Sequence, residues 1–221
     1  MSASLDNTIW LWDTKSEMTT ISIMENDEKS ELSSMSYLLE AGLVATGHED
    51  GHIRLWNLEI GTHVLITGEG GNKMKHWSTV SCIKGIKYKG SEYLICGSYD
   101  GRISVWEISL KAQAGSTATN WQVYPQLKSV IQNYVQDKSE LFGNEIHAIH
   151  YFPSERDNEE KIIVGGNPID INIFLLKTSE KEATLSSMHT DSVTCLCMDG
   201  YFLFSGSDDM TIVIWNMTNY T

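Results

Sequence analysis

The sequence predicts an all-β fold built from repeated β-hairpins, because one frame of eleven residues recurs four times with the composition of a hairpin. The copies are SASLDNTIWLW (2–12), TGHEDGHIRLW (46–56), CGSYDGRISVW (96–106) and SGSDDMTIVIW (205–215). In each copy an aspartate precedes a tryptophan by six residues. These pairs are Asp6 and Trp12, Asp50 and Trp56, Asp100 and Trp106, and Asp209 and Trp215.

Each column of this frame has a physical reason. Asp-Asn and Asp-Gly pairs tolerate positive φ, so they suit the tight turn of a hairpin. After the turn, aliphatic residues alternate with their neighbours, as in Ile103 and Val105, which is the period of a strand. A small residue stands three positions before each aspartate, and we expect it to leave room for the tryptophan ring on the neighbouring strand. The small residues are Ala3, Gly47, Gly97 and Gly206.

Two further patterns extend the repeat. A weaker copy lies at residues 164–176, where we expect Asp170 to hold the turn and Leu176 to replace the tryptophan. The stretches HWSTVSCI (76–83) and HTDSVTCL (189–196) match at histidine, valine and cysteine, and each lies just before one of the hairpins.

These motifs resemble the WD-repeat family over nearly the whole chain, apart from an insertion at residues 111–142. The resemblance implies a β-propeller with four antiparallel strands per blade, held by a network of histidine, hydroxyl, turn aspartate and tryptophan. In the third repeat Cys96 occupies the hydroxyl column and would make a weaker hydrogen bond. The second repeat has no histidine at its start, so its network should be incomplete. The residues implied are His189, Ser205, Asp209 and Trp215; His76, Asp100 and Trp106; Thr46, Asp50 and Trp56; and Asp6 and Trp12.

We expect residues 1–221 to form a single partial propeller of about five blades, given about 40 to 45 residues per blade. Residues 1–4 already belong to the strand before the Asp6 turn, and six residues follow Trp215. Because open strand edges invite pairing, we expect further sequence or another chain to complete the ring.

The insertion at residues 111–142 is longer than ordinary connections. After Pro125, apolar residues recur at the spacing of an amphipathic helix, so we predict a short helix there. It either lies against its own propeller or docks in a partner's groove. The apolar positions are Leu127, Val130, Ile131, Tyr134 and Val135.

Composition narrows the classes of function. The chain has 16 basic and 29 acidic side chains, a formal net charge of -13, which disfavours nucleic acid and anionic membranes and favours basic partners. We expect no signal peptide and no membrane span. Four cysteines are too few for a disulfide scaffold in a chain of this length, which favours a reducing, cytoplasmic location.

Candidate catalytic and metal groups have structural explanations. The spacing of His189 and Asp209 fits the blade network, and no nucleophile completes a triad. We expect Cys195 and Cys197 to be core thiols rather than half of a zinc site, which needs four ligands. The glycine-rich residues 68–72 lack the lysine of a phosphate loop and read as a connecting turn. His147 and His150 should face opposite sides of a strand. We therefore expect no catalytic activity, cofactor or metal.

The sequence favours a non-catalytic platform for other proteins within a large assembly. The alternative is a regulatory or enzymatic propeller with a site at the face of the central channel. The phrasing of residues 47–57 and 189–215 also resembles WD-repeat proteins of cilia and flagella, which implies a structural part of the axoneme. If partners use the channel face, the resemblance points to the residue before each turn aspartate and to a nearby tryptophan. These are Leu5, Glu49, Tyr99, Asp208 and Trp77.

Overall fold

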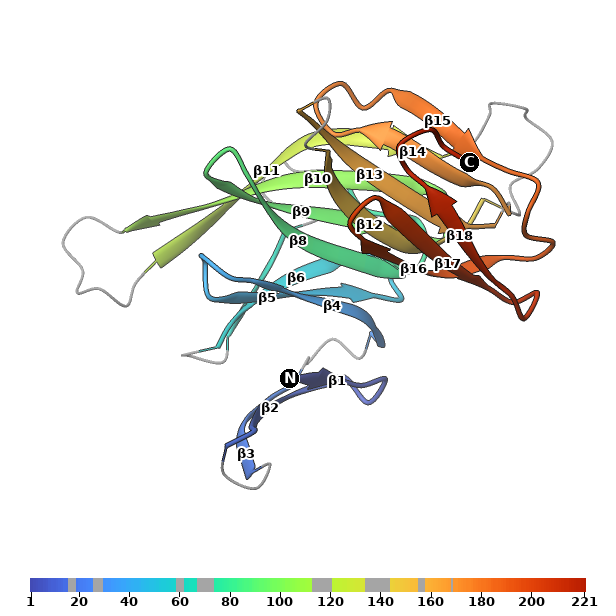
Figure 1. The fold of residues 1–221 in the computed structure, drawn as a ribbon. Helices are drawn as coiled ribbons and strands as arrows, with labels where there is room; N and C mark the ends of the chain where they lie inside the picture. Colours follow the sequence, from blue (N-terminus) through green and yellow to red (C-terminus); the bar gives the residue numbers. More distant parts are fainter. Residues whose placement is uncertain are drawn as a thin grey trace.

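A computed structural model describes residues 1–15, 19–25, 30–58, 62–66, 74–112, 121–133, 144–154, 158–167 and 169–221. Within these residues every helix or strand is a β-strand, and the strands form five antiparallel sheets in chain order (Figure 1). The all-β prediction is confirmed. The glycine-rich residues 68–72 lie outside the described part of the chain.

Three of the sheets have four strands each. The second sheet contains β4 (Leu32–Leu38), β5 (Leu43–His48), β6 (Ile53–Asn57) and β7 (His63–Leu65). The third sheet contains β8 (Cys82–Tyr88), β9 (Ser91–Gly97), β10 (Arg102–Ala112) and β11 (Trp121–Gln132). The fourth sheet contains β12 (Ile146–Ser154), β13 (Glu159–Gly166), β14 (Ile171–Leu175) and β15 (Lys181–Leu185).

The sheets at the two ends of the chain have three strands. The N-terminal sheet contains β1 (Ser2–Ala3), β2 (Thr8–Asp13) and β3 (Thr19–Glu25). The last sheet contains β16 (Val193–Asp199), β17 (Phe202–Ser207) and β18 (Ile212–Asn216). Its three strands match the first three strands of a four-stranded sheet, and no described residue forms a fourth.

Consecutive sheets pack face to face, and the repeat tryptophans of the second, third and last sheets lie in the cores shared with the sheet before. Trp106 of the third sheet shares a core with Leu38 and Leu55 of the second. Trp215 of the last sheet packs with Ile163 and Ile173 of the fourth. This stack of twisted sheets is the arrangement expected of propeller blades.

Two glycines of the small-residue column, Gly47 and Gly97, serve this stacking, and our expectation that they make room for a tryptophan ring is wrong. A Cβ at Gly47 would lie 2.7 Å from Val80, which leads into the next sheet, and one at Gly97 would lie 2.7 Å from Ile146. These glycines therefore let the first strand of the following sheet approach the backbone closely.

The predicted count of about five blades needs correction. Four sheets, β4 to β18, stack closely, whereas the N-terminal sheet lies at the edge of the stack and meets it mainly through β1 and β4 (Figure 1). Its β1 has only two residues, and a small core around Ile9 and Trp56 holds it to the second sheet. The body of the propeller therefore has four blades.

The predicted helical insertion is also wrong. Leu127, Val130 and Ile131 lie in β11, the long outer strand of the third sheet, while Tyr134 and Val135 fall outside the described residues. From Val123 to Gln132 burial alternates strictly, with Leu127 and Ile131 facing inward and Val130 outward. A spacing of four residues fits both a strand and a helix, and this coincidence misled the prediction.

In the weaker copy of the repeat, at residues 164–176, the alignment with the other copies needs correction. Phe174 pairs with Ile162 as Trp106 pairs with Leu94, so Phe174, and not Leu176, occupies the tryptophan column of the fourth sheet. Phe174 is buried in the core that the third and fourth sheets share.

No described sheet covers the far face of the last sheet. Ile212 and Ile214 are 74% and 59% exposed, whereas their counterparts Ile103 and Val105 are buried beneath the next sheet. Cys195 and Cys197 lie on the same uncovered face and are exposed free thiols, so the prediction of core thiols is wrong. Among the described residues the first and last sheets share no strand pairing, and the sheets form an open arc.

Candidate functional site

The last sheet holds the complete network that the resemblance implies. Trp215 Nε1 donates to Ser205 Oγ at 2.8 Å, Ser205 Oγ lies 2.7 Å from His189 Nε2, and His189 Nδ1 lies 2.9 Å from Asp209. A proton on Nδ1 of the histidine lets every donor meet an acceptor. Hydrogen bonds from the Thr211 side chain and the Thr190 backbone help hold the pKa of Asp209 well below its usual range.

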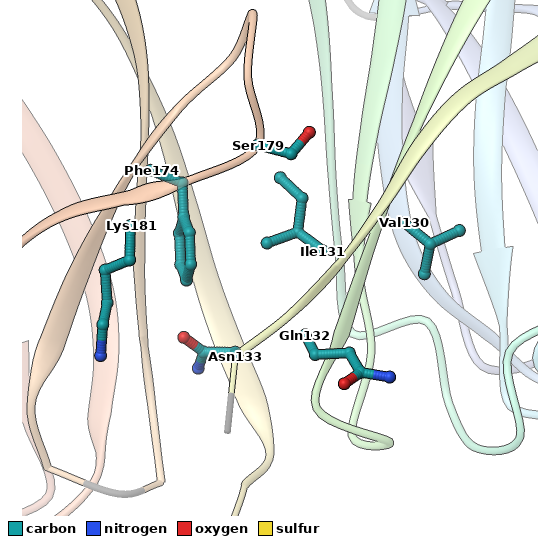
Figure 2. Close-up of a pocket in the computed structure, with 7 residues that line it drawn as sticks. All are labelled: Val130, Ile131, Gln132, Asn133, Phe174, Ser179 and Lys181. Carbon is teal, nitrogen blue, oxygen red and sulfur yellow. The ribbon is translucent and has the colours of Figure 1, made fainter. Parts of the chain in front are cut away.

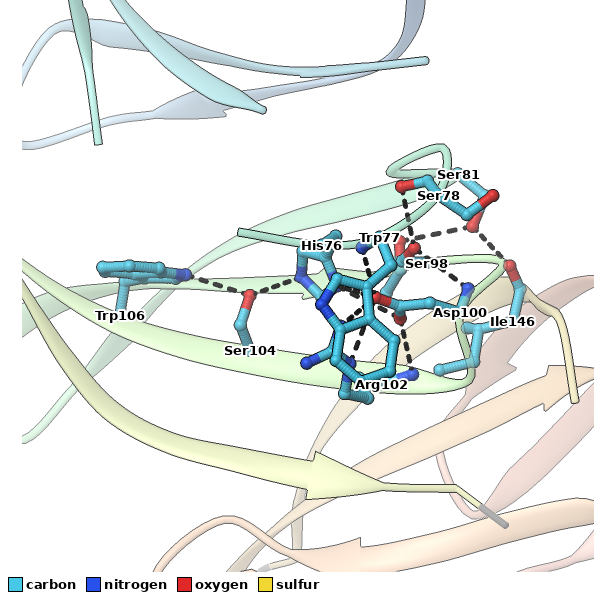
Figure 3. Close-up of polar contacts among 11 residues, drawn as sticks. His76, Trp77, Ser78, Ser81, Ser98, Asp100, Arg102, Ser104, Trp106 and Ile146 are labelled. Carbon is cyan, nitrogen blue, oxygen red and sulfur yellow. Dashed lines mark hydrogen bonds and ion pairs between the residues drawn. The ribbon is translucent and has the colours of Figure 1, made fainter. Parts of the chain in front are cut away.

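The third sheet builds the same network with its hydroxyl moved to another strand. Ser104 Oγ accepts from Trp106 Nε1 at 3.0 Å and lies 2.9 Å from His76 Nε2 (Figure 3). Ser104 pairs directly with Cys96 across β9 and β10, so a hydroxyl reaches the same place from the opposite strand. The expectation that Cys96 supplies the hydrogen bond to this network is therefore corrected.

The aspartate of this network, Asp100, is hydrogen-bonded by several neighbouring groups. His76 Nδ1 lies 3.2 Å from both oxygens of Asp100, and the Arg102 Nη2 donates to one of them at 2.9 Å. Burial alone would raise the pKa of Asp100, but the hydrogen bond and charge of His76 and the hydrogen bonds from the backbone of Trp77 and Arg102 lower it to about 2. Asp100 is therefore ionised at neutral pH.

The second sheet builds part of the network from residues of its own strands. Trp56 Nε1 donates to Thr46 Oγ1 at 2.8 Å, and His48 Nε2, two residues along the same strand, lies 2.8 Å from that hydroxyl. Burial, with a smaller contribution from Arg54, lowers the pKa of His48 to about 4. His48 takes the place of the histidine that other repeats supply before the first strand. Its Nδ1, however, lies 3.1 Å from the backbone oxygen of Ser30 and makes no described contact with Asp50, so this network lacks its histidine–aspartate link, as the sequence led us to expect.

Asp50 of the second sheet turns toward its own strand. Its carboxylate lies 3.0 Å from His52 Nδ1 and 3.7 Å from Arg54 Nη2. Burial would raise the pKa of Asp50, but hydrogen bonds from His52 lower it to about 2.

The N-terminal sheet keeps part of the pattern. Trp12 Nε1 donates to Ser2 Oγ at 2.8 Å, and Asp6 accepts hydrogen bonds from the backbone and hydroxyl of Thr8. The rings of Trp10 and Trp12 stack with centroids 5.3 Å apart. No described histidine joins this set, so Asp6 stabilises only its own turn.

These networks are built for stability rather than for reaction. In the last and third sheets the hydroxyl is buried between a tryptophan and a histidine, so it has no room to attack a substrate. Among the described residues no group of three histidine, cysteine or acidic side chains could hold a metal ion. His147 lies beside Tyr99 while His150 lines a separate pocket, so the two histidines do not converge.

The predicted partner-binding residues lie at one end of the stack. Four of them precede the aspartate of the turn before a tryptophan-bearing strand, and Trp77 leads into the first strand of the third sheet. Backbone hydrogen bonds tie these turns to the segment before the first strand, such as Tyr99 N to Thr79 O and Asp208 N to Ser192 O. We call this end the turn rim. Its exposed candidates are Leu5, Glu49, Trp77, Tyr99 and Asp208.

Trp77 is the most exposed of the tryptophans with a described environment, at 78%, and it is held in place. Its backbone N–H donates to Asp100 at 2.8 Å, and the Arg102 guanidinium lies over its ring at 3.7 Å from the centroid (Figure 3). Tyr99 lies in the turn between β9 and β10, next to Asp100, with its ring centroid 5.0 Å from that of His147. The sequence indicated Trp77, whereas it gave no sign of Arg102.

Two pockets open between elements of the third, fourth and last sheets. One, of about 430 Å³, opens between β11 and the β14–β15 hairpin, where Ile131, Asn133 and Phe174 line it (Figure 2). A smaller one, of about 300 Å³, lies where β12 meets the β16–β17 turn and is lined by His150, Pro153 and Tyr201. Neither holds a converging set of acid, base and nucleophile.

Comparison with known proteins identifies the repeat. The family described as "WD domain, G-beta repeat" matches residues 20–57, 63–107 and 180–216, more than half of the chain. None of the described residues form a helix with the length and hydropathy needed to cross a bilayer.

Curated relatives are distant and longer. Zinc finger CCCH domain-containing protein 62 of Arabidopsis thaliana is 26% identical over 194 residues, 80% of this chain and 44% of that protein. The ribosome biogenesis protein WDR12 homolog of Dictyostelium discoideum is 26% identical over 113 residues, 50% of this chain and 23% of that protein. Protein lethal(2)denticleless of Drosophila melanogaster is 23% identical over 256 residues, 98% of this chain and 30% of that protein. The chain spans less than half the length of each.

Among solved structures, a chain in the crystal structure of the mitotic checkpoint complex has a TM-score of 0.70. It is 17% identical, and the match covers 99% of this chain and 57% of that one. At this level of identity the likeness supports the propeller fold alone.

Proposed function

Because this chain belongs to the WD40-repeat family, we propose that it is a non-catalytic platform that binds other proteins through its turn rim. The observation that supports the proposal is that, at that end of the stack, one residue of each turn is bound within the blade and its neighbour is exposed. Each turn aspartate of the third and last sheets is bound inside its network, while the residue before it, Tyr99 or Asp208, is exposed. The turn backbone is thus held in place by the network while the neighbouring side chains remain accessible to a partner. Such preorganisation lowers the entropic cost of binding.

We further propose the kind of partner and the cellular location. The net charge of -13 favours basic proteins over nucleic acid and anionic membranes. The names of a ribosome biogenesis relative and of the mitotic checkpoint complex describe those proteins, and both fit a role within a large assembly. We propose a cytoplasmic location, with the axoneme of cilia as a narrower assignment that rests on resemblance of phrasing. Imaging of the tagged protein in ciliated cells tests that assignment.

The uncovered ends of the arc suggest how the platform sits in its assembly. We propose that further propeller blades, from this protein or from another chain, cover the far face of the last sheet. The exposed Ile212 and Ile214 occupy positions that a following sheet covers in the third repeat.

Affinity purification with charge-reversed variants tests the rim. Glu49→Lys combined with Asp208→Lys changes the turn rim, whereas Glu180→Lys combined with Asp199→Lys changes exposed carboxylates at the opposite end of the sheets. The proposal expects the rim variant to lose co-purifying proteins that the wild type and the opposite-end variant keep. Equal recovery by all three proteins would refute it.

A further inference from the structure

The repeat network does not require a tryptophan at position 77. The last sheet makes the same histidine, hydroxyl and aspartate contacts with Thr190 at the equivalent position, and Thr190 N donates to Asp209 as Trp77 N donates to Asp100. Thr211 there replaces Arg102. The indole of Trp77 therefore adds exposed apolar area that blade stability does not explain.

The indole is also fixed before any partner arrives. Arg102 lies over one ring face, and its Nε and Nη2 donate to Asp100 at 3.2 and 2.9 Å. Asp100 in turn binds the buried His76. Because 78% of Trp77 is exposed, its opposite ring face is open. A rigid aromatic ring of this kind is the type of residue that dominates binding energy at protein interfaces.

The charge around the turn rim decides what should bind the open ring face. Glu31, Glu49, Asp191 and Asp208 are exposed carboxylates on the turns and on the segments before the first strands. Arg102, which lies over the indole, is paired with Asp100, and Lys75 lies two residues before Trp77. Two of the four carboxylates belong to the second sheet and two to the last, so the rim as a whole, in a chain with a net charge of -13, favours a positive partner.

We propose that Trp77 anchors a basic segment of the protein partner by stacking an arginine side chain on its open face. This inference rests on the proposed function of the turn rim and specifies its partner chemistry. A planar guanidinium can stack on the outer face as Arg102 does on the inner one, while neighbouring arginines meet the rim carboxylates.

The test uses the whole chain and short synthetic peptides in calorimetric titrations. The probe is a serine-rich peptide with three arginines, compared with the same peptide carrying citrulline, which keeps the shape and lacks the charge. Trp77→Thr copies the last sheet and should leave the melting temperature unchanged. Tyr201→Thr removes a half-exposed aromatic at the opposite end and serves as the matched control.

The inference expects the arginine peptide to bind the wild type and the Tyr201→Thr control equally, and Trp77→Thr about tenfold more weakly. The citrulline peptide should bind at least tenfold more weakly than the arginine peptide to the wild type. Undiminished binding to Trp77→Thr, or equal binding of the two peptides, would overturn the inference. If that happened while the Glu49 and Asp208 variant still lost its co-purifying proteins, the proposed function would stand and only the partner chemistry would fail.

Discussion

The relocated hydroxyl of the third sheet gives a quantitative prediction. Ser104 is fully buried and serves both Trp106 and His76. Ser104→Ala leaves the indole N–H of Trp106 and the imidazole Nε2 of His76 without hydrogen-bond partners at a buried site. Each unsatisfied buried group costs about 1–3 kcal/mol, so two of them should lower the free energy of unfolding by about 2–6 kcal/mol.

A second substitution should rescue the first. Cys96 lies directly across from Ser104, and the last sheet carries its hydroxyl on that strand, at Ser205. Cys96→Ser in the Ser104→Ala background should therefore restore much of the stability, with a coupling of about 1–3 kcal/mol between the two positions.

Urea unfolding of the four proteins of this double-mutant cycle measures the coupling. Ser109→Ala, at a more exposed serine of the same strand, controls for loss of a hydroxyl in β10 and should change stability by less than about 0.5 kcal/mol. If the two substitutions proved additive, the hydroxyl would not be shared between facing strands and the reasoning would fail.

The remaining predictions concern burial and protonation. Because the pKa of His48 is about 4 in the folded chain against an ordinary 6.5, the unfolded chain binds the proton first, and stability should fall by about 3 kcal/mol as pH drops from 6.5 to 4; His48→Gln should flatten that part of the pH profile in urea melts. Trp215→Ala should destabilise by about 3–5 kcal/mol, and a neutral melt would remove this tryptophan from the packed core. Replacing residues 112–138 with a short linker should now lower the β signal in circular dichroism, since β11 belongs to the third sheet; an unchanged spectrum would contradict the structure.

The repeated hairpins could be predicted from the sequence because the residues that define them lie close together along the chain. Turn aspartates, positive-φ residues such as Gly101, and alternating aliphatic residues act within a few positions of one another. The aspartate and tryptophan columns of four sheets could therefore be read directly.

Contacts between strands were harder to read. Ser104 substitutes for Cys96 only because the two residues face each other, a register that a column-by-column comparison does not reveal. His48 likewise replaces a histidine that other repeats carry in a different segment. The glycines were assigned to the wrong neighbour because the packing they permit is between sheets.

The β11 error has a different origin. Leu127 and Ile131 are four residues apart, a spacing that helices and strands share, and the flanking Val130 added helical character. The alternation of Tyr124, Gln126 and Lys128 with inward residues was the signal that could have decided for a strand.

Hydrogen–deuterium exchange of the native complex, purified with its partners, tests the central claim most directly. Compared with the free chain, the account predicts added protection at the turn rim, in residues 48–52, 77–79, 98–101 and 207–211. Protection confined to the opposite-end turns, such as residues 199–202, with no change at the rim, would contradict it.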